Sequence, residues 1–196
     1  MSGRLIITGA ILILSLPGVA AFSAEKGFFA ELDASVYIMN WENRYLYGFT
    51  PQVGYKLSSD YLAGLSCGYY MTDSIEMPGG GNKYTHYPLR LHLQRHINDL
   101  LFLEGGLEYL FIRRETHGFY HTDTGFVFDS HESSDHAHGP FIGLGLSGPV
   151  GQSIELVGRA SHSFTHYRGT KLFRSATETE RDVGGIGLDF GLRYYF

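Results

Sequence analysis

The sequence predicts an all-β fold, specifically an eight-stranded antiparallel up-and-down transmembrane β-barrel. Three observations support this prediction. Eight segments alternate between apolar side chains and small, polar or charged ones, which is the period of a strand with two different faces. The composition, with 26 Gly, 14 Tyr and 14 Phe, favours strands and turns over helices. The connections between the segments alternate between short and mostly long, which places the two kinds at opposite ends of a barrel.

The first 23 residues have the pattern of a secretory signal peptide and are excluded from the fold prediction. Arg4 provides a positive charge, residues 5–16 form a mostly apolar run, and Pro17 and Gly18 end it. Small residues near positions 21–24 then offer a cleavage site. The run is shorter than the roughly 20 residues that a membrane-spanning helix needs, which favours export over an uncleaved anchor. We therefore expect one mature domain, residues 24–196.

The C-terminal segment shows the alternation most clearly. From Ile186 to Phe196 every second residue is apolar, and most residues between them are small, polar or charged. The same pattern occurs in seven earlier segments, at residues 29–38, 48–57, 61–71, 86–94, 101–111, 142–147 and 154–163. After the signal peptide no continuous apolar run reaches the length of a spanning helix. Strands cross a membrane only as a closed barrel, because lipid offers no partner to an open sheet edge.

The connections indicate which face of the expected barrel lies outside. Connections two, four and six are short, at residues 58–60, 96–98 and 148–152. Connections one, three, five and seven cover residues 40–44, 72–83, 114–139 and 166–184. Barrels embedded in a membrane separate short turns from long loops in this way. We therefore expect the apolar rows to face lipid. In a soluble carrier barrel, which is the alternative, they would face inward.

With these features the mature chain resembles the small outer-membrane barrels of the OmpA-like, OmpX-like and opacity-protein type. The resemblance implies the outer membrane of a Gram-negative-type bacterium, with lipopolysaccharide and other outer-membrane lipid around the barrel. It also implies that the barrel-assembly machinery recognises the terminal strand, through Phe190, Leu192, Tyr194 and Phe196. Because such barrels host many functions, the resemblance implies an architecture and leaves the activity open.

Ionisable side chains occupy many positions that are expected to face the interior. We expect an internal charge network of Glu31, Asp33, Arg90, Glu104, Glu108, Arg159, Asp189 and Arg193. A turn at residues 96–98 predicts that Arg90 lies opposite Glu104 and that His86 lies opposite Glu108. The interior of an eight-stranded barrel is only wide enough for side chains. The network therefore predicts a plug rather than a pore, with no catalysis at its carboxylates.

The fifth connection is rich in histidine. Its histidines are His117, His121, His131, His136 and His138. Imidazole is a common transition-metal ligand, but these residues lack the fixed spacing of a structural zinc site. We therefore expect no metal site and no cofactor, while metal binding or a response to mild acid by this connection stays open.

Aromatic side chains are frequent near the expected strand ends. They include Tyr45, Tyr47, Tyr69, Tyr84, Tyr87, Tyr109, Phe111 and Tyr194. Tyrosine favours the boundary between membrane and water, because its ring is apolar and its hydroxyl is polar. These residues therefore predict an aromatic rim at the membrane surface.

The seventh expected strand resembles that of the lipid A deacylases, small outer-membrane barrels with a lipid-facing histidine and a serine two residues later. By parity His162 faces outward, but the residue two positions later is Phe164. Ser161 and Ser163 are expected on the opposite face. The nucleophile is therefore missing at the required place, and we expect no catalytic residue.

Charge and cysteine content limit the partners. The formal net charge of −5, without basic clusters, argues against a nucleic-acid partner. The single cysteine, Cys67, excludes an intramolecular disulfide. We expect a non-catalytic outer-membrane protein that acts in surface interaction, adhesion or envelope integrity, with an extracellular ligand bound by its loops. Lipid A modification, a soluble periplasmic carrier and a narrow channel are the alternatives.

Overall fold

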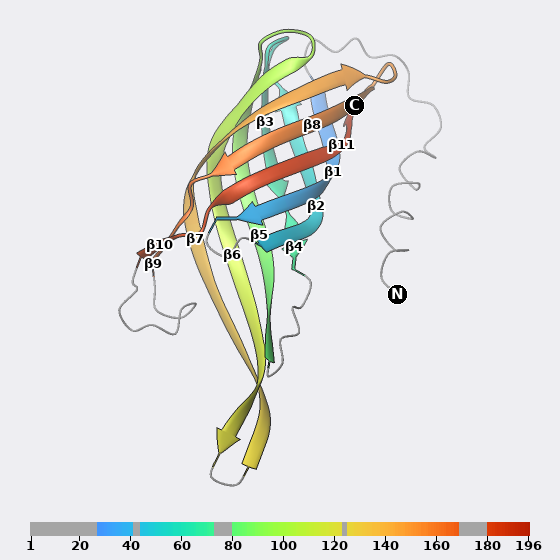
Figure 1. Ribbon diagram of the computed structural model, residues 1–196. Helices are drawn as coiled ribbons and strands as arrows, with labels where there is room; N and C mark the ends of the chain where they lie inside the picture. Colours follow the sequence, from blue (N-terminus) through green and yellow to red (C-terminus); the bar gives the residue numbers. More distant parts are fainter. Residues whose placement is uncertain (1–26, 41–43, 73–79, 123–124, 169–179) are drawn as a thin grey trace.

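The computed structural model describes residues 27–40, 44–72, 80–122, 125–168 and 180–196, and every regular element in them is a strand (Figure 1). The predicted signal peptide, residues 1–23, lies outside this part of the chain. Within the described residues no helix is long and apolar enough to cross a membrane. The strands are β1 (Gly27–Met39), β2 (Arg44–Lys56), β3 (Tyr61–Cys67), β4 (Tyr69–Met71), β5 (Gly80–His96), β6 (Leu101–Thr122), β7 (Gly125–Pro149), β8 (Ile154–Ser163), β9 (His166–Arg168), β10 (Glu180–Asp182) and β11 (Gly185–Tyr195).

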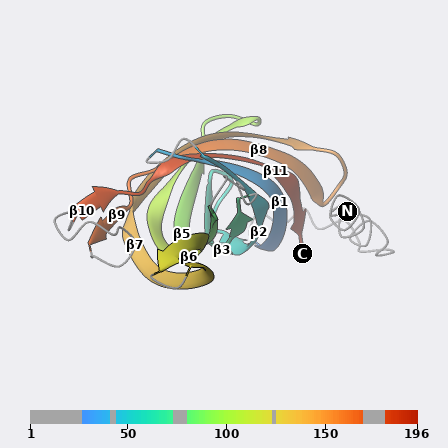
Figure 2. The same cartoon turned by 60° about the horizontal axis from the view of Figure 1, so that its bottom comes forward.

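The strands form one closed antiparallel barrel. β1 pairs with β2 on one side and with β11 on the other, and β11 leads through β8 to β7, so the wall closes on itself (Figure 2). Three strands of the wall are interrupted, because β3 continues as β4, β8 as β9, and β10 as β11. Counted as continuous strands, the wall has eight. The predicted eight-stranded antiparallel barrel is confirmed.

Prolines in the neighbouring strands explain two of the interruptions. The break between β3 and β4 lies at Gly68, opposite Pro88 of β5. The break between β8 and β9 begins at Phe164, opposite Pro140 of β7. A proline has no N–H to donate, which removes one bond of the ladder. Its carbonyl still accepts: Gly68 N donates to Pro88 O at 2.8 Å, and Phe164 N donates to Pro140 O at 2.9 Å. The pairing therefore continues across both breaks.

The wall has an apolar outer face. Its exposed large side chains include Val53, Leu65, Leu89, Leu91, Leu93, Leu103, Leu107, Ile142, Leu144, Leu146, Leu188 and Phe190. Residues between them in the sequence point inward, as on β1, where Glu31, Asp33 and Ser35 are buried and Ala34 is exposed. The apolar rows thus face outward, as predicted, and not inward as in a soluble carrier. An apolar surface that surrounds the whole wall is stable in lipid and not in water.

The fifth connection differs most from the sequence prediction. Residues 114–139 were expected to form a loop, but β6 and β7 continue as a hairpin to the pair Thr122 and Gly125. β5 pairs with β6 as far as Gly80 and Gly118. Polar side chains dominate here, so hydrophobic alternation gives no signal, and backbone hydrogen bonds define the strands. We call residues 80–83, 113–122 and 125–136 the extension. It projects beyond the barrel at the bottom of Figure 1.

The predicted register between the fourth and fifth wall strands is wrong. Arg90 lies opposite Glu108 rather than Glu104, and His86 lies opposite Ile112 rather than Glu108. Ile97 N donates to Leu101 O at 2.8 Å, so the turn comprises residues 98–100 instead of 96–98, and the side chain of Asn98 accepts bonds from the amides of the two residues that follow Asp99. Moving the centre of an antiparallel turn by two residues shifts every partner by four.

Candidate functional site

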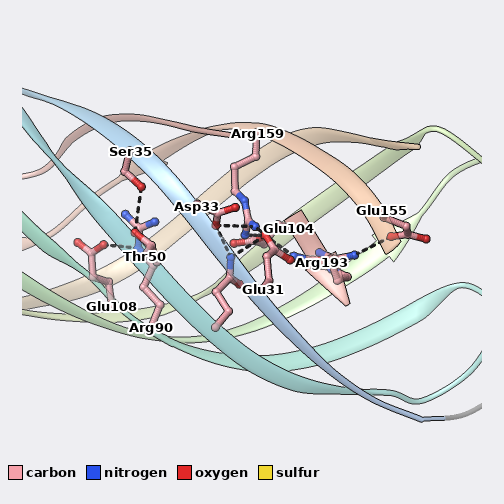
Figure 3. Close-up of polar contacts among 12 residues, drawn as sticks. Glu31, Asp33, Ser35, Thr50, Arg90, Glu104, Glu108, Glu155, Arg159 and Arg193 are labelled. Carbon is pink, nitrogen blue, oxygen red and sulfur yellow. Dashed lines mark hydrogen bonds and ion pairs between the residues drawn. The ribbon is translucent and has the colours of Figure 1, made fainter. Parts of the chain in front are cut away.

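Charged side chains from several strands meet in the middle of the barrel (Figure 3). Arg159 of β8 contacts Glu31 and Asp33 of β1 and Glu104 of β6. Its Nη2 lies 3.1 Å from Asp33 Oδ2, and its Nη1 lies 2.9 Å from Glu104 Oε2. All four residues are buried. A guanidinium group has five donors in a fixed fork, which allows one arginine to serve several carboxylates.

Arg193 of β11 extends this cluster toward the end of the barrel that has the short turns. Its side chain is fully buried, with Nε 2.7 Å from Glu31 Oε2. Its Nη2 donates to Gln94 Oε1 at 2.8 Å, and its Nη1 lies 3.5 Å from Glu155 Oε2. The guanidinium also stacks over the ring of Phe29 at 4.9 Å. We call the residues joined by Arg159 and Arg193 the central network.

A second ion pair lies apart from the central network. Arg90 Nε is 2.5 Å from Glu108 Oε2, and the Ser163 hydroxyl donates to Glu108 Oε1 at 2.6 Å. Asp189 is also buried on the inner face but forms no ion pair or hydrogen bond with the described residues. The interior residues named from the sequence thus form a central network, a separate pair and one unpaired carboxylate. We call these eight residues the charged layer.

A group of apolar and aromatic side chains fills the other half of the lumen, toward the extension. This apolar layer consists of Tyr37, Met39, Leu46, Tyr70, Tyr84, Leu110, Ile112, Ala137, Tyr167 and Val183. Sequence reasoning missed it and placed Tyr84 in the outer aromatic rim, although Tyr84 is fully buried inside. Parity was the available signal, because Tyr84 shares a face with His86 and Arg90, while Tyr87 lies on the other.

Both layers consist of buried side chains that point into the lumen. Figure 3 shows the charged side chains reaching across the barrel from opposite walls. No group of three or more His, Cys, Asp or Glu side chains in the described residues is arranged to hold a metal ion. The candidate site therefore consists of the charged and apolar layers inside the lumen and of the surfaces outside the barrel.

The extension begins in a set of polar contacts above the apolar layer. Arg113 donates to Glu132 Oε2 at 2.8 Å across β6 and β7, and this hydrogen bond together with the carboxylate charge raises the pKa of Arg113. The Tyr167 hydroxyl donates to Asp135 Oδ2 at 2.6 Å. The His136 ring stacks on Tyr109 with centroids 5.5 Å apart. These contacts fasten the base of the extension to the barrel wall. Among the five histidines, the structure describes the side chains of His136 and His138, and both are exposed.

The residues of the deacylase-like pattern do not form a catalytic arrangement on the outer face. His162 contacts Phe164, with ring centroids 4.4 Å apart, and its cross-strand neighbours are Ile142 and Ile186. Ser163 is buried in the lumen and bonds to Glu108, as described above. A histidine can activate a serine only within hydrogen-bond reach. At His162 the described residues offer apolar neighbours instead.

The C-terminal strand closes the barrel between β1 and β8. Phe190 and Phe196 are exposed, and Leu192 and Tyr194 are half-buried on the same outer face. The rings of Tyr194 and Phe196 contact each other edge to face with centroids 5.0 Å apart. Phe196 N donates to the carbonyl of Phe28 at 3.0 Å, which fastens the chain end to β1. The strand thus presents a row of apolar side chains on the outside of the wall.

The fold is that of the small eight-stranded outer-membrane barrels. The chain is similar to a major outer-membrane protein of Thermus thermophilus, with 13% identity, 88% of this chain and 100% of that chain covered, and a TM-score of 0.65. It is also similar to Ail, the attachment invasion locus protein of Yersinia pestis, with 13% identity, 89% and 100% coverage, and a TM-score of 0.55. A second Ail structure, in complex with the heparin analogue sucrose octasulfate, has 13% identity, 87% and 97% coverage, and a TM-score of 0.53. No protein-family model and no curated protein sequence matches the chain.

Proposed function

We propose that the protein is an exported, non-catalytic barrel of the outer membrane that presents its extension for contact with an extracellular ligand. The extension is the observation that supports this proposal: β6 and β7 continue as a paired hairpin well past the last residues where β4 meets β5 and β9 meets β7. A hairpin anchored in a rigid barrel presents side chains at a fixed position without folding on its own.

The wall suits the anchor function. Its apolar outer face fits outer-membrane lipid and lipopolysaccharide as the surrounding partners. Residues 1–23 would direct export of the mature domain, residues 24–196. The row of Phe190, Leu192, Tyr194 and Phe196 on the terminal strand would be the signal for the barrel-assembly machinery. The filled lumen favours an anchor over a narrow channel, and the apolar surroundings of His162 favour a non-enzyme over a lipid A deacylase.

The class of ligand follows from one structural neighbour and from the extension itself. Ail has been crystallised with a heparin analogue, a sulfated sugar. The extension of the present protein carries Arg113 and Arg114 at its base and four of the five histidines along its length, and the fifth, His138, follows two residues after its end. Histidine gains positive charge between about pH 8 and pH 5, which suits binding of anionic groups. We therefore take a sulfated glycan as the first ligand to test.

The test shortens the extension while keeping its register. Thr116 and His131 are paired, so replacing residues 117–130 by Asn-Gly gives a two-residue hairpin turn at the base. We expect the shortened protein to show the gel shift on heating that folded barrels show and to lose binding of sucrose octasulfate, measured by calorimetry. A second variant, with the five histidines changed to asparagine, keeps the hairpin and should lose the increase in binding at pH 5.5.

Two results would contradict the proposal. Equal binding by the shortened and complete proteins would place the ligand site outside residues 117–130, the part of the chain that the variant removes. If bacteria with the shortened protein bind normally and only loss of the whole barrel makes them sensitive to detergent, the function is envelope integrity and not surface contact.

A further inference from the structure

Two histidines from different strands lie directly opposite each other on the outside of the wall. His138 of β7 pairs with His166 of β9, and both side chains are exposed. The register is continuous up to this point, because Phe141 and Ser163 pair in the same alignment on β7 and β8. Cross-strand partners point to the same face of a sheet, with Cβ atoms about 4.5–5.5 Å apart. The two imidazoles therefore project side by side from neighbouring strands.

The cross-strand row that contains this pair lies at the boundary between membrane and water. His138 also pairs with Tyr109 of β6, and His166 also pairs with Asp182 of β10, which is exposed. Phe164, two residues before His166, is exposed on the apolar wall. A carboxylate is stable in water and tyrosine favours the interface, so water reaches this row. The histidine pair is therefore accessible to dissolved ions.

Within the described residues neither imidazole has a bonding partner. His138 and His166 form no hydrogen bond and no ion pair with these residues. Because both side chains are exposed, each ring can turn about its Cα–Cβ bond toward the other without displacing a packed neighbour. The carboxylate of Asp182 adds a negative charge in the same row, which favours a cation beside His166.

A third exposed histidine, His136, points in a different direction. It lies two residues before His138 on the same face of β7, but its ring stacks on Tyr109 with centroids 5.5 Å apart and planes at 14°. Tyr109 belongs to β6, and β7 lies between β6 and β9. The Nδ1 atom of His136 also lies 3.6 Å from Asp135 Oδ1. His136 therefore turns away from His166, and the cross-strand pair is separate from it.

We propose that His138 and His166 together bind one divalent transition-metal ion at the outer rim of the barrel. Imidazole nitrogen suits Cu²⁺, Ni²⁺ and Zn²⁺, with bonds of about 2.0–2.1 Å to zinc. Two imidazoles whose Cβ atoms are about 5 Å apart can both reach such an ion, and water completes its coordination. The site is a pair of ligands, which is smaller than the groups of three or more His, Cys, Asp or Glu that are absent from the described residues.

A bound ion would link β7 to β9 where β7 continues into the extension. β9 is a strand of three residues, so the link would hold a short strand to its neighbour. The site belongs to the barrel wall and does not depend on an extracellular ligand of the extension. His138 lies in the fifth connection and His166 in the seventh, so the spacing of histidines along the sequence gives no signal for the pair.

The experiment uses the mature barrel without an affinity tag, folded in a neutral detergent and freed of metal with EDTA. About half an equivalent of CuCl₂ should give one electron paramagnetic resonance spectrum with splitting from two nitrogen atoms, since Cu²⁺ is the tightest binder of these ions. His138→Asn and His166→Asn should each lose this spectrum and weaken copper binding, measured by calorimetry, by about tenfold or more. His136→Asn removes an exposed imidazole outside the pair, and this matched control should bind copper as the wild type does.

Two results would overturn the proposal. One is a wild-type barrel that binds no copper. The other is equal copper binding by the wild type and His166→Asn; a loss in His136→Asn and His138→Asn alone would then place the ion on the two histidines of β7. The gel shift on heating verifies that each variant folds. If His166→Asn does not fold, His166→Gln replaces it under the same criteria.

Discussion

The charged layer and the apolar layer fill the same barrel by different physical means. The charged layer depends on direction: Arg159 and Arg193 must each reach several oxygen atoms at hydrogen-bond distance. The apolar layer depends on volume, since side chains such as Leu110 and Ile112 have only to exclude space from one another. The comparison shows that one half of a lumen can be closed by directional ion pairs and hydrogen bonds and the other half by apolar packing.

Because the charged layer depends on direction and the apolar layer on volume, the two layers should differ in how well they tolerate substitutions. Removing one member of a buried ion-pair network leaves its partners charged and unpaired, which costs more than the pair itself contributes. A volume-conserving change in an apolar layer leaves nothing unpaired. The two layers should therefore respond differently to substitutions of similar size.

The largest effect is expected at Arg159. Arg159→Ala leaves Glu31, Asp33 and Glu104 without their shared cation, and the free energy of unfolding should fall by about 3–5 kcal/mol. Urea titration of the folded barrel in lipid vesicles measures this quantity. A loss below about 1 kcal/mol would mean that the network contributes no directional stabilisation.

A smaller effect is expected at Gly191. In Gly191→Ala the new Cβ would collide with Asp33 Oδ1 and with the backbone oxygen of Leu32, and the resulting shift should cost about 1–3 kcal/mol. Gly158→Ala makes the same chemical change where the nearest atom, in Phe190, is 3.7 Å away. The same titration should find the Gly158 variant close to the wild type. Equal losses in both variants would indicate a general cost of alanine in the wall.

A still smaller effect is expected in the apolar layer. Leu110→Met conserves volume and introduces no charge, so the loss should stay below about 1.5 kcal/mol. Thermal unfolding followed by the gel shift gives an independent value. A loss as large as that of Arg159→Ala would contradict the difference between the layers.

The smallest effect is expected outside both layers. Arg113→Ala removes an exposed ion pair with Glu132, and exposed pairs contribute little because water and salt screen them. The urea midpoint should equal that of the wild type within error. A clear loss would mean that the extension is coupled to barrel stability.

The sequence predicted the wall because its two faces meet different solvents. Alternation in residues such as Leu89, Leu91 and Leu93 directly reports an apolar surrounding, and the opposite parity marks inward residues. This same rule identified which charged residues face the lumen. The alternation rule does not identify cross-strand partners, because a register shift of an even number of residues leaves every side chain on the same face.

The features that sequence reasoning missed have no periodic signal of that kind. The register of Arg90 depends on the local hydrogen bonds of Asn98, which decide where the turn begins. The segments 113–118 and 129–136 of the extension are mostly polar, so the sequence offers no apolar row there. Part of the apolar layer could be predicted, because Leu110 and Ile112 follow Glu108 on the same face of the strand. Which inward residues contact each other across the lumen depends on how the barrel closes.

Single-channel recording in a planar lipid bilayer tests the central claim, a lumen closed by two layers, most directly. The same sample should first show the gel shift on heating, so that the protein added to the bilayer is folded. The account predicts no discrete conductance steps for the wild-type protein. Stable steps of uniform size would contradict it, because ions would then have a continuous path through both the charged and the apolar layer.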